Sequence, residues 1–153
     1  MKKLTLEIII PVCNEEKNIT LLYEKIKSLN LELNYNIIFI DDGSTDSTLE
    51  IIKKINHKDK RVRAISFSRN FGHQIALSAG IDYSDCDILI MMDGDFQHPP
   101  ENIPVMIKKY EEGYDVVQLV KANQGKRYFL QKISSYIFYL LFRRISGINI
   151  SNN

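Results

Sequence analysis

Long apolar runs and cysteines are both scarce in this chain of 153 residues. The longest uninterrupted apolar run covers residues 136–142, and a membrane-spanning helix needs roughly 18 or more such residues. The two cysteines, Cys13 and Cys86, lie beside apolar runs, which favours reduced thiols in the cytoplasm over a disulfide framework. No small-residue cleavage site follows the basic N-terminus, so the sequence predicts no signal peptide.

Several function classes are disfavoured because the sequence lacks residues that they require. The glycine fingerprint of dinucleotide-binding domains is absent after the first apolar run. A receiver domain would have an acidic pair at that position, where Pro11 stands instead. A phosphatase of the haloacid-dehalogenase type would have Thr two residues after Asp95, where the chain has Gln97. These alternatives are therefore weak.

Acidic residues are also absent from the C-terminal part of the chain. From Val116 onward there are six Lys or Arg residues and no Asp or Glu, although the net charge of the whole chain is +1. The preceding part is therefore net negative. With 44% hydrophobic and 25% charged residues, the composition is that of a soluble globular protein. The length suits one domain over residues 1–153, since no repeat or linker interrupts it.

Apolar runs of strand length alternate with helical patterns along the chain. The predicted strands cover residues 4–10, 35–40, 63–67, 87–92 and 115–120. This alternation predicts an α/β fold with a mostly parallel, Rossmann-like sheet flanked by helices. Polar residues follow several of these strands, and ligands of open α/β sheets bind at the carboxyl ends of the strands. The candidate site is therefore expected there.

Asp93 and Asp95 follow the predicted strand over residues 87–92. Mg²⁺ is typically bound by one or two carboxylates together with substrate phosphates, so this pair is sufficient for a divalent cation. Gly94, between them, allows a diphosphate to approach the backbone closely. The alternative for such a pair is a polar turn that only ends a strand. The spacing alone leaves both interpretations open.

Other polar residues follow the first three predicted strands. Asn14 and Glu15 could bind a base or a ribose, or Asn14 could simply cap the next helix. The pair Asp41 and Asp42 could likewise belong to a site or to a helix entrance. His73 is interpreted as structural, because a lone histidine more often has that role.

Four motifs together resemble the family 2 inverting glycosyltransferases, and more narrowly the polyprenyl-phosphate and dolichol-phosphate sugar transferases. The motifs are IPVCNEE at residues 10–16, DDGSTD at 41–46, SRNFGH at 68–73 and MDGDFQHPPE at 92–101. They occur in the family's order, and the resemblance extends from Leu4 to about Ile150. Their combination raises the functional interpretation of each motif above that of any motif alone.

The resemblance implies a GT-A fold, a UDP-sugar or GDP-sugar donor, Mg²⁺ or Mn²⁺ as cofactor, and a polyprenyl-phosphate acceptor. It assigns catalysis to Asp93 and Asp95, and metal binding to Asp95 and Gln97. The residues that it assigns to nucleotide binding are Pro11, Val12, Asn14, Glu15, Asp42 and Asp93.

The chain departs from the family pattern at its C-terminus. Members of the family continue into an acidic motif and often into membrane helices, whereas this sequence stops at Asn153. The resemblance therefore implies a C-terminally incomplete domain. The alternative to a complete transferase is a truncated nucleotide-sugar-binding module without full turnover. Cys13 and Lys121 are milder departures, since members of the family often have Tyr and Arg there.

Apolar residues recur at helical spacing over residues 126–147, among basic residues. This pattern predicts a basic amphipathic helix, which could pack on a core or lie at an anionic membrane surface. The lipid acceptor implied by the resemblance favours the membrane, with a peripheral location at its cytoplasmic face. A homo-oligomer could also cover the apolar stripe. No nucleic-acid partner is expected.

Overall fold

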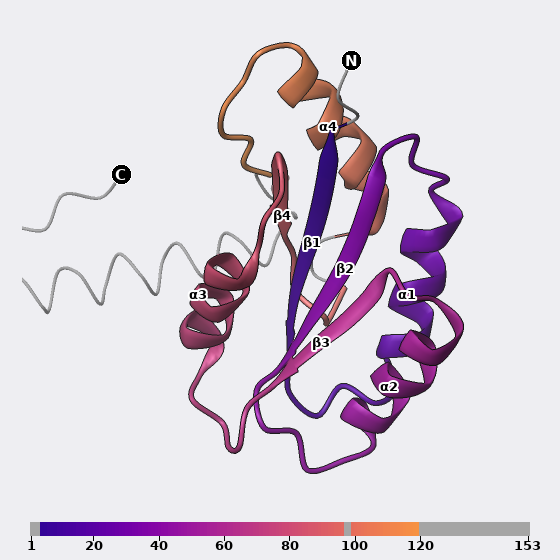
Figure 1. Cartoon of the computed structure of the whole chain (residues 1–153), viewed down its shortest axis with the longest axis vertical. Coiled ribbons are helices and arrows are strands. Elements are labelled where there is room, and N and C mark those ends of the chain that lie inside the picture. Colours follow the sequence, from indigo (N-terminus) through magenta and orange to yellow (C-terminus); the bar gives the residue numbers. More distant parts are fainter. Residues whose placement is uncertain (1–3, 97–98, 120–153) are drawn as a thin grey trace, which may run out of the picture. The chain divides into compact units, whose positions relative to one another are not determined.

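Four parallel strands form one sheet within residues 4–96 and 99–119, which are the residues that the computed structural model describes. The strands are β1 (Thr5–Val12), β2 (Asn34–Asp41), β3 (Val62–Ser66) and β4 (Ile88–Met91). Their order is β3-β2-β1-β4 (Figure 1), so the direction of winding reverses beside β1. This arrangement confirms the predicted α/β class, and ligands of such sheets bind at the carboxyl ends of the strands at the reversal.

The central strands are buried on both faces of the sheet. Ile8 of β1 is in register with Ile37 of β2, and Ile9 is in register with Ile38. All four side chains are almost completely buried, but Ile8 and Ile37 belong to one core cluster while Ile9 and Ile38 belong to the other. Burial on both faces explains why these strands appear in the sequence as continuous apolar runs.

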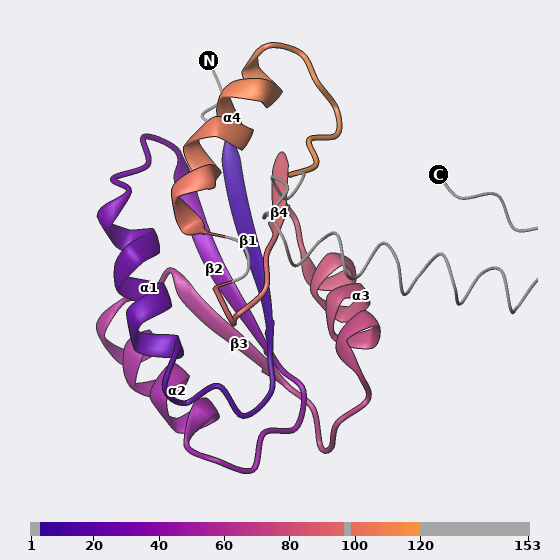
Figure 2. The same cartoon turned by 180° about the vertical axis from the view of Figure 1, so that it is seen from behind.

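Helices cover both faces of the sheet (Figures 1 and 2). One face packs against α1 (Ile19–Ser28), α2 (Thr48–Lys58) and α4 (Ile103–Glu111), which follows a short 3₁₀ turn at Pro100–Asn102. The opposite face packs against α3 (His73–Tyr83). The loops that follow the strands therefore all emerge at one edge, because every strand runs in the same direction.

Asn14 does not cap the next helix, which was one of the two interpretations that its sequence position allowed. Helix α1 begins at Ile19, with Asn18 at its N-cap position, while Asn14 has a left-handed backbone with φ of 56°. The side-chain oxygen of Asn14 instead accepts hydrogen bonds from the backbone nitrogens of Thr45 and Asp46, at 2.8 and 3.4 Å. Asparagine tolerates this conformation better than most residues, and here its side chain joins two loops.

The strand expected over residues 115–120 is also not formed over residues 115–119, and residue 120 lies outside the described part. Asp115 and Val116 are exposed, and Val116 retains 85% of its accessible surface. A strand is stabilised by ladder partners and by packing on at least one face. The described residues provide no ladder partner for this segment, so its apolar composition alone does not produce a strand.

The chain divides into two compact units, one ending at Val117 and the other beginning at Gln118. All the described helices and strands belong to the first unit. The single domain over residues 1–153 stays a prediction, and the basic helix predicted over 126–147 lies outside the described residues. In the described part, no helix combines the length and apolar character needed to cross a bilayer.

Candidate functional site

A cavity of about 310 Å³ lies at the carboxyl ends of the strands, beside the reversal in strand order. Four loops contribute to it, and each follows one of the four strands of the described part. The lining residues are Pro11, Val12, Cys13, Glu15, Asp42, Asn70, Gly72, His73, Asp93, Gly94 and Asp95. Its size is at the lower end of the range for small-molecule sites.

Most of the site residues predicted from the sequence meet in this cavity. Those that line it are Pro11, Val12, Glu15, Asp42, Asp93 and Asp95. Asn14 is not among the lining residues, and Gln97 lies outside the described residues. Parallel strands bring their carboxyl ends to one edge, so the position of these residues directly after apolar runs was sufficient to group them.

Asp42 attaches the loop after β3 to the end of β2. Its side chain is buried, and its two oxygens accept hydrogen bonds from the backbone nitrogens of Phe71 and Gly72, at 2.7 and 2.9 Å. The backbone nitrogen of Asp42 itself donates to the carbonyl of Val12, at 2.9 Å. Charge-assisted bonds of this kind are stronger than neutral ones, so Asp42 determines where one wall of the cavity lies.

Replacing Asp42 with Asn is expected to destabilise the fold and to loosen this wall. The amide has one acceptor oxygen, so one of the two backbone nitrogens would face an NH₂ donor instead. Leaving a buried donor unsatisfied costs about 1–3 kcal/mol in the free energy of unfolding. Urea denaturation measures this loss. The control is Asp82→Asn, which removes the same charge from an exposed position on α3. Equal stability of the two variants would contradict the role assigned to Asp42.

Gly94 permits the turn after β4 to pack closely against β1. A Cβ atom at this position would lie 2.9 Å from Cγ1 of Val12 and 3.4 Å from the carbonyl oxygen of Pro11. The structure thus gives a reason for glycine that is independent of any ligand. This close packing places Asp93 and Asp95 next to the end of β1 and completes the lining of the cavity.

His73 lies beside Asp93, although the sequence indicated only a structural role for it. Its Nε2 is 3.5 Å from Oδ1 of Asp93, and both side chains are partly exposed. His73 is the first residue of α3, directly after Gly72, which Asp42 holds through its backbone nitrogen. The clue to this position was the motif after β3, because its loop emerges at the same edge as the acidic residues.

Asn70 and Cys13 also line the cavity, although the sequence did not indicate them as site residues. Their side chains are joined by a 3.2 Å hydrogen bond from Nδ2 of Asn70 to Sγ of Cys13.

The turn after Asp95 is held by α1. Phe96 has a left-handed backbone with φ of 63°, an uncommon conformation for an aromatic residue that often occurs at functional sites. Nζ of Lys25 lies 5.5 Å from the centre of the Phe96 ring and 3.0 Å from Oε1 of Glu101. Lys25 therefore contacts the chain on both sides of residues 97–98.

Carboxylates dominate the charge of the cavity. Glu15, Asp42, Asp93 and Asp95 line it, with His73 as the basic side chain among the described lining residues. Converging like charges repel, and a bound cation reduces that repulsion. In the part of the chain that the structure describes, no three His, Cys, Asp or Glu side chains form a metal site by themselves. The exposed position of Asp95 fits a cation that is also bound by phosphates of a ligand.

Comparison with known proteins identifies the class to which this chain belongs. The parallel four-stranded sheet flanked by helices has the architecture of the GT-A glycosyltransferases. Residues 7–152 match the model of Glycosyl transferase family 2. The chain belongs to this family, which confirms the resemblance carried by the four motifs.

Two relatives support this assignment. Uncharacterized glycosyltransferase YkcC of Bacillus subtilis (strain 168) is 41% identical over 145 residues, covering 94% of this chain and 45% of the relative. Undecaprenyl-phosphate 4-deoxy-4-formamido-L-arabinose transferase of Proteus mirabilis (strain HI4320) is 40% identical over 133 residues, covering 85% of this chain and 41% of the relative. The chain thus spans less than half the length of these two relatives.

A solved structure shares the fold. Glucosyl-3-phosphoglycerate synthase from Mycobacterium tuberculosis, in complex with Mn²⁺, UDP and phosphoglyceric acid, is 26% identical and superposes with a TM-score of 0.59. The match covers 81% of this chain and 45% of the synthase. The architecture of the described residues is therefore also found in an enzyme that was crystallised with a nucleotide and a divalent cation.

Proposed function

We propose that this chain transfers a sugar from a nucleoside diphosphate sugar, with UDP or GDP as the nucleotide, to a polyprenyl phosphate. The observation that carries the proposal is the cavity at the carboxyl ends of β1 and β4, with Asp93 and Asp95 in its lining. The undecaprenyl-phosphate transferase of Proteus mirabilis supports the choice of acceptor. The complex of the mycobacterial synthase with UDP and Mn²⁺ supports the choice of donor and cofactor.

In this proposal the nucleoside contacts the loop that follows β1, against Pro11, Val12 and Glu15. Asp93 lies near the ribose and the diphosphate. Asn14 and Asp42 contribute by holding the loops, through the backbone hydrogen bonds that their side chains accept. Direct contacts between the nucleotide and these two side chains remain a prediction from the sequence. The donor would thus be bound by loops whose positions are determined before it arrives, which reduces the cost of binding.

Asp95 and Gln97 are the proposed ligands of Mg²⁺ or Mn²⁺. A bound cation of this kind stabilises the negative charge that develops on the departing nucleoside diphosphate. In the transfer, an acceptor phosphate oxygen forms a bond to the anomeric carbon while the bond from that carbon to the diphosphate oxygen breaks. Attack from the face opposite the diphosphate inverts the configuration. The acceptor phosphate is already ionised at neutral pH, so its oxygen needs little help from a general base.

A lipid acceptor requires the chain to work at a membrane surface, and we propose the cytoplasmic face. The basic residues of the segment 126–147 support this location, since each Lys or Arg near an anionic surface contributes about 1 kcal/mol. The protein would then be peripheral, with its donor cavity open to soluble nucleotide sugars.

Calorimetric titration tests the donor site. UDP-glucose and GDP-mannose are titrated separately into the chain, each with Mg²⁺, with Mn²⁺ and with excess chelator. We expect one nucleotide to bind in the presence of metal and to lose at least about tenfold in affinity, equivalent to roughly 1.4 kcal/mol, when the metal is removed. If neither nucleotide binds at about 1 mM, the proposed site is wrong.

A transfer assay then separates an enzyme from a binding module. The chain is incubated with the bound nucleotide sugar, the preferred metal and a short-chain polyprenyl phosphate in detergent, and the glycolipid is measured. Formation of glycolipid with release of the nucleoside diphosphate supports the full proposal. If the chain binds the donor but forms no glycolipid, the result supports the alternative, a nucleotide-sugar-binding module without full turnover.

A further inference from the structure

A second cavity, of about 620 Å³, lies between α1 and α2. It shares no lining residue with the acidic cavity. Its volume is within the range of small-molecule sites. The residues that line it are Thr20, Tyr23, Glu24, Lys27, Ile51, Lys54, Ile55, Lys58, Asp59 and Arg61. Two helices and the segment that leads into β3 therefore form a site that the proposed sugar transfer does not use.

Helical periodicity brings the basic residues to this cavity. Lys54 and Lys58 lie one turn apart on α2, so their side chains emerge on the same face of the helix. Lys27 extends from α1, and its Nζ lies 5.5 Å from the centre of the Tyr23 ring. Lysine side chains from two different helices thus border one concave surface, with Tyr23 and Ile55 as its buried lining residues.

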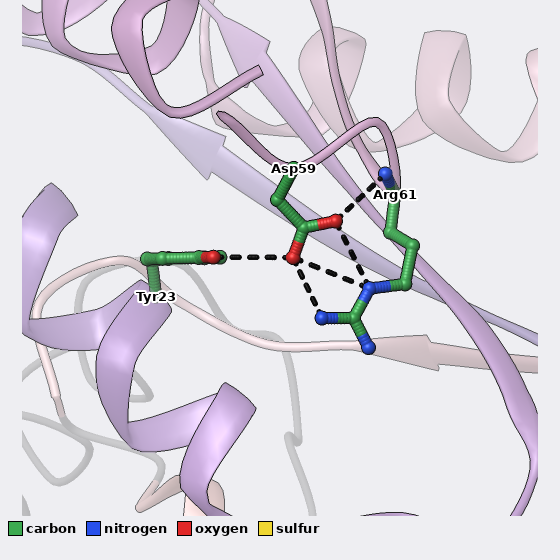
Figure 3. A network of polar contacts seen from close by, with 3 residues as sticks. All are labelled: Tyr23, Asp59 and Arg61. Carbon is green, nitrogen blue, oxygen red and sulfur yellow. Dashed lines mark hydrogen bonds and ion pairs between the residues drawn. The ribbon is translucent and has the colours of Figure 1, made fainter. Parts of the chain in front are cut away.

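A polar network within the cavity neutralises one of its two acidic side chains (Figure 3). Asp59 accepts hydrogen bonds from the guanidinium of Arg61, with Nη2 at 2.6 Å and Nε at 3.0 Å, and from the hydroxyl of Tyr23 at 3.1 Å. The hydrogen bonds from Arg61 lower the pKa of Asp59 to about 2. Asp59 is therefore ionised at neutral pH, and its charge is balanced by Arg61.

The remaining charge of the cavity is positive. The charges of Arg61 and Asp59 balance each other. The other charged lining residues are Lys27, Lys54 and Lys58, which are positive, and Glu24, which is negative. Within the described residues, none of these three lysines forms an ion pair. The neighbouring Lys53 pairs with Glu50 at 2.8 Å, and Lys54 interacts with that carboxylate only from a longer distance. Like charges one helical turn apart destabilise a helix, and a bound anion would relieve this repulsion. A concave surface with a net positive charge also concentrates anions.

We infer that the cavity between α1 and α2 is a second binding site, for a phosphate-bearing anion that Lys27, Lys54 and Lys58 hold at the border of the cavity. Lysine ammonium groups bind phosphates as mobile point charges, so a flexible three-lysine border suits a phosphate group. Two sources could supply this group: a soluble phosphorylated molecule or the headgroup of an anionic lipid. The inference does not rest on sugar transfer, because the two cavities share no residue.

The test uses the whole chain in buffer with excess chelator, so that metal-dependent binding at the acidic cavity does not contribute. In one arm, inorganic pyrophosphate is titrated calorimetrically. In the other, the protein is sedimented with phosphatidylcholine vesicles that contain or lack phosphatidic acid. The variant Lys54→Gln/Lys58→Gln is compared with Lys53→Gln/Lys60→Gln, which removes two charges from exposed positions outside the cavity lining.

We expect the cavity variant to bind the anion about tenfold more weakly than the wild type, and the control variant to stay within about twofold. Both variants should retain the thermal stability of the wild type within a few degrees. Binding of pyrophosphate alone would identify a soluble ligand, and binding of phosphatidic acid vesicles alone would identify a lipid headgroup. Equal weakening in the two variants, or no binding in either arm, would overturn the inference.

Discussion

Replacing Asp95 with Asn is expected to weaken metal-dependent nucleotide binding by about a hundredfold, or roughly 3 kcal/mol. Asp95 is exposed at the mouth of the acidic cavity, directly after the close contact between Gly94 and β1. Asparagine keeps the size of the side chain but removes the negative charge, and a divalent cation depends on ionised oxygen ligands. The loss is measured by calorimetry with the nucleotide sugar in the presence of Mg²⁺ and Mn²⁺.

The matched control for Asp95 is Asp82→Asn. Asp82 is exposed on α3, nine residues beyond the His73 that lines the cavity, which is about 14 Å along the helix axis. Because both substitutions remove one charge, a general electrostatic effect would appear in both variants. We expect Asp82→Asn to bind within about twofold of the wild type. Metal-dependent binding that survives in Asp95→Asn would show that the cation is held elsewhere.

Replacing Gly43 with Ala is expected to cost about 3–5 kcal/mol in the free energy of unfolding. Gly43 has a left-handed backbone with φ of 68°. Its new Cβ would lie 2.3 Å from the backbone carbonyl carbon of Arg69 and 2.6 Å from the backbone nitrogen of Asn70. Backbone atoms cannot rotate away as a flexible side chain can, so one loop must move. Asn70 lines the acidic cavity, and we therefore expect nucleotide binding to weaken as well.

Gly113 offers a control that separates the backbone conformation from the steric overlap. It also has a positive φ, of 95°, but a Cβ there would meet no atom within 4 Å. Gly113→Ala should therefore lose only the conformational contribution, about 1–2 kcal/mol. Thermal and urea denaturation compare the two variants. If Gly43→Ala is no less stable than Gly113→Ala, then the loops after β2 and β3 are not as closely packed as the structure indicates.

The strands and the position of the acidic cavity were predictable because their signals are local. Continuous apolar runs marked β1, β2 and β4, and burial on both faces accounts for the runs of the central strands β1 and β2. The segment of β3 was shorter and of mixed composition. Asp93 and Asp95 directly follow the last of these runs. Parallel strands bring their carboxyl ends together whatever the details of packing, and the grouping of Pro11, Asp42 and Asp95 in one cavity followed from that rule.

The contacts within the site were not predictable from local signals. Asp42 bonds to backbone atoms 29 and 30 residues away, and Asn14 bonds to the backbone 31 residues away. The residue types at these positions fit a helix entrance and a helix cap equally well. Which partner a polar side chain finds depends on the loops that the folded sheet places beside it.

Dependence on neighbours in the folded structure also explains why the strand expected over residues 115–120 and the position of His73 differ from the sequence predictions. Residues 115–119 have strand-like composition, but β propensity depends on a neighbouring ladder, and the described residues supply none for this segment. His73 gave no signal of its own, and only the packing of α3 on the sheet places it 3.5 Å from Asp93.

The sequence by itself determined the α/β class, the family and the edge of the sheet at which the acidic residues gather. Those properties depend on apolar periodicity and on motifs that are contiguous in the chain. The tertiary structure alone decided that Asp42 and Asn14 hold loops, that His73 faces Asp93, and that α1 and α2 enclose a basic cavity. Each of these depends on the distance between residues that are far apart in sequence, and that distance exists only once the sheet and its helices have packed.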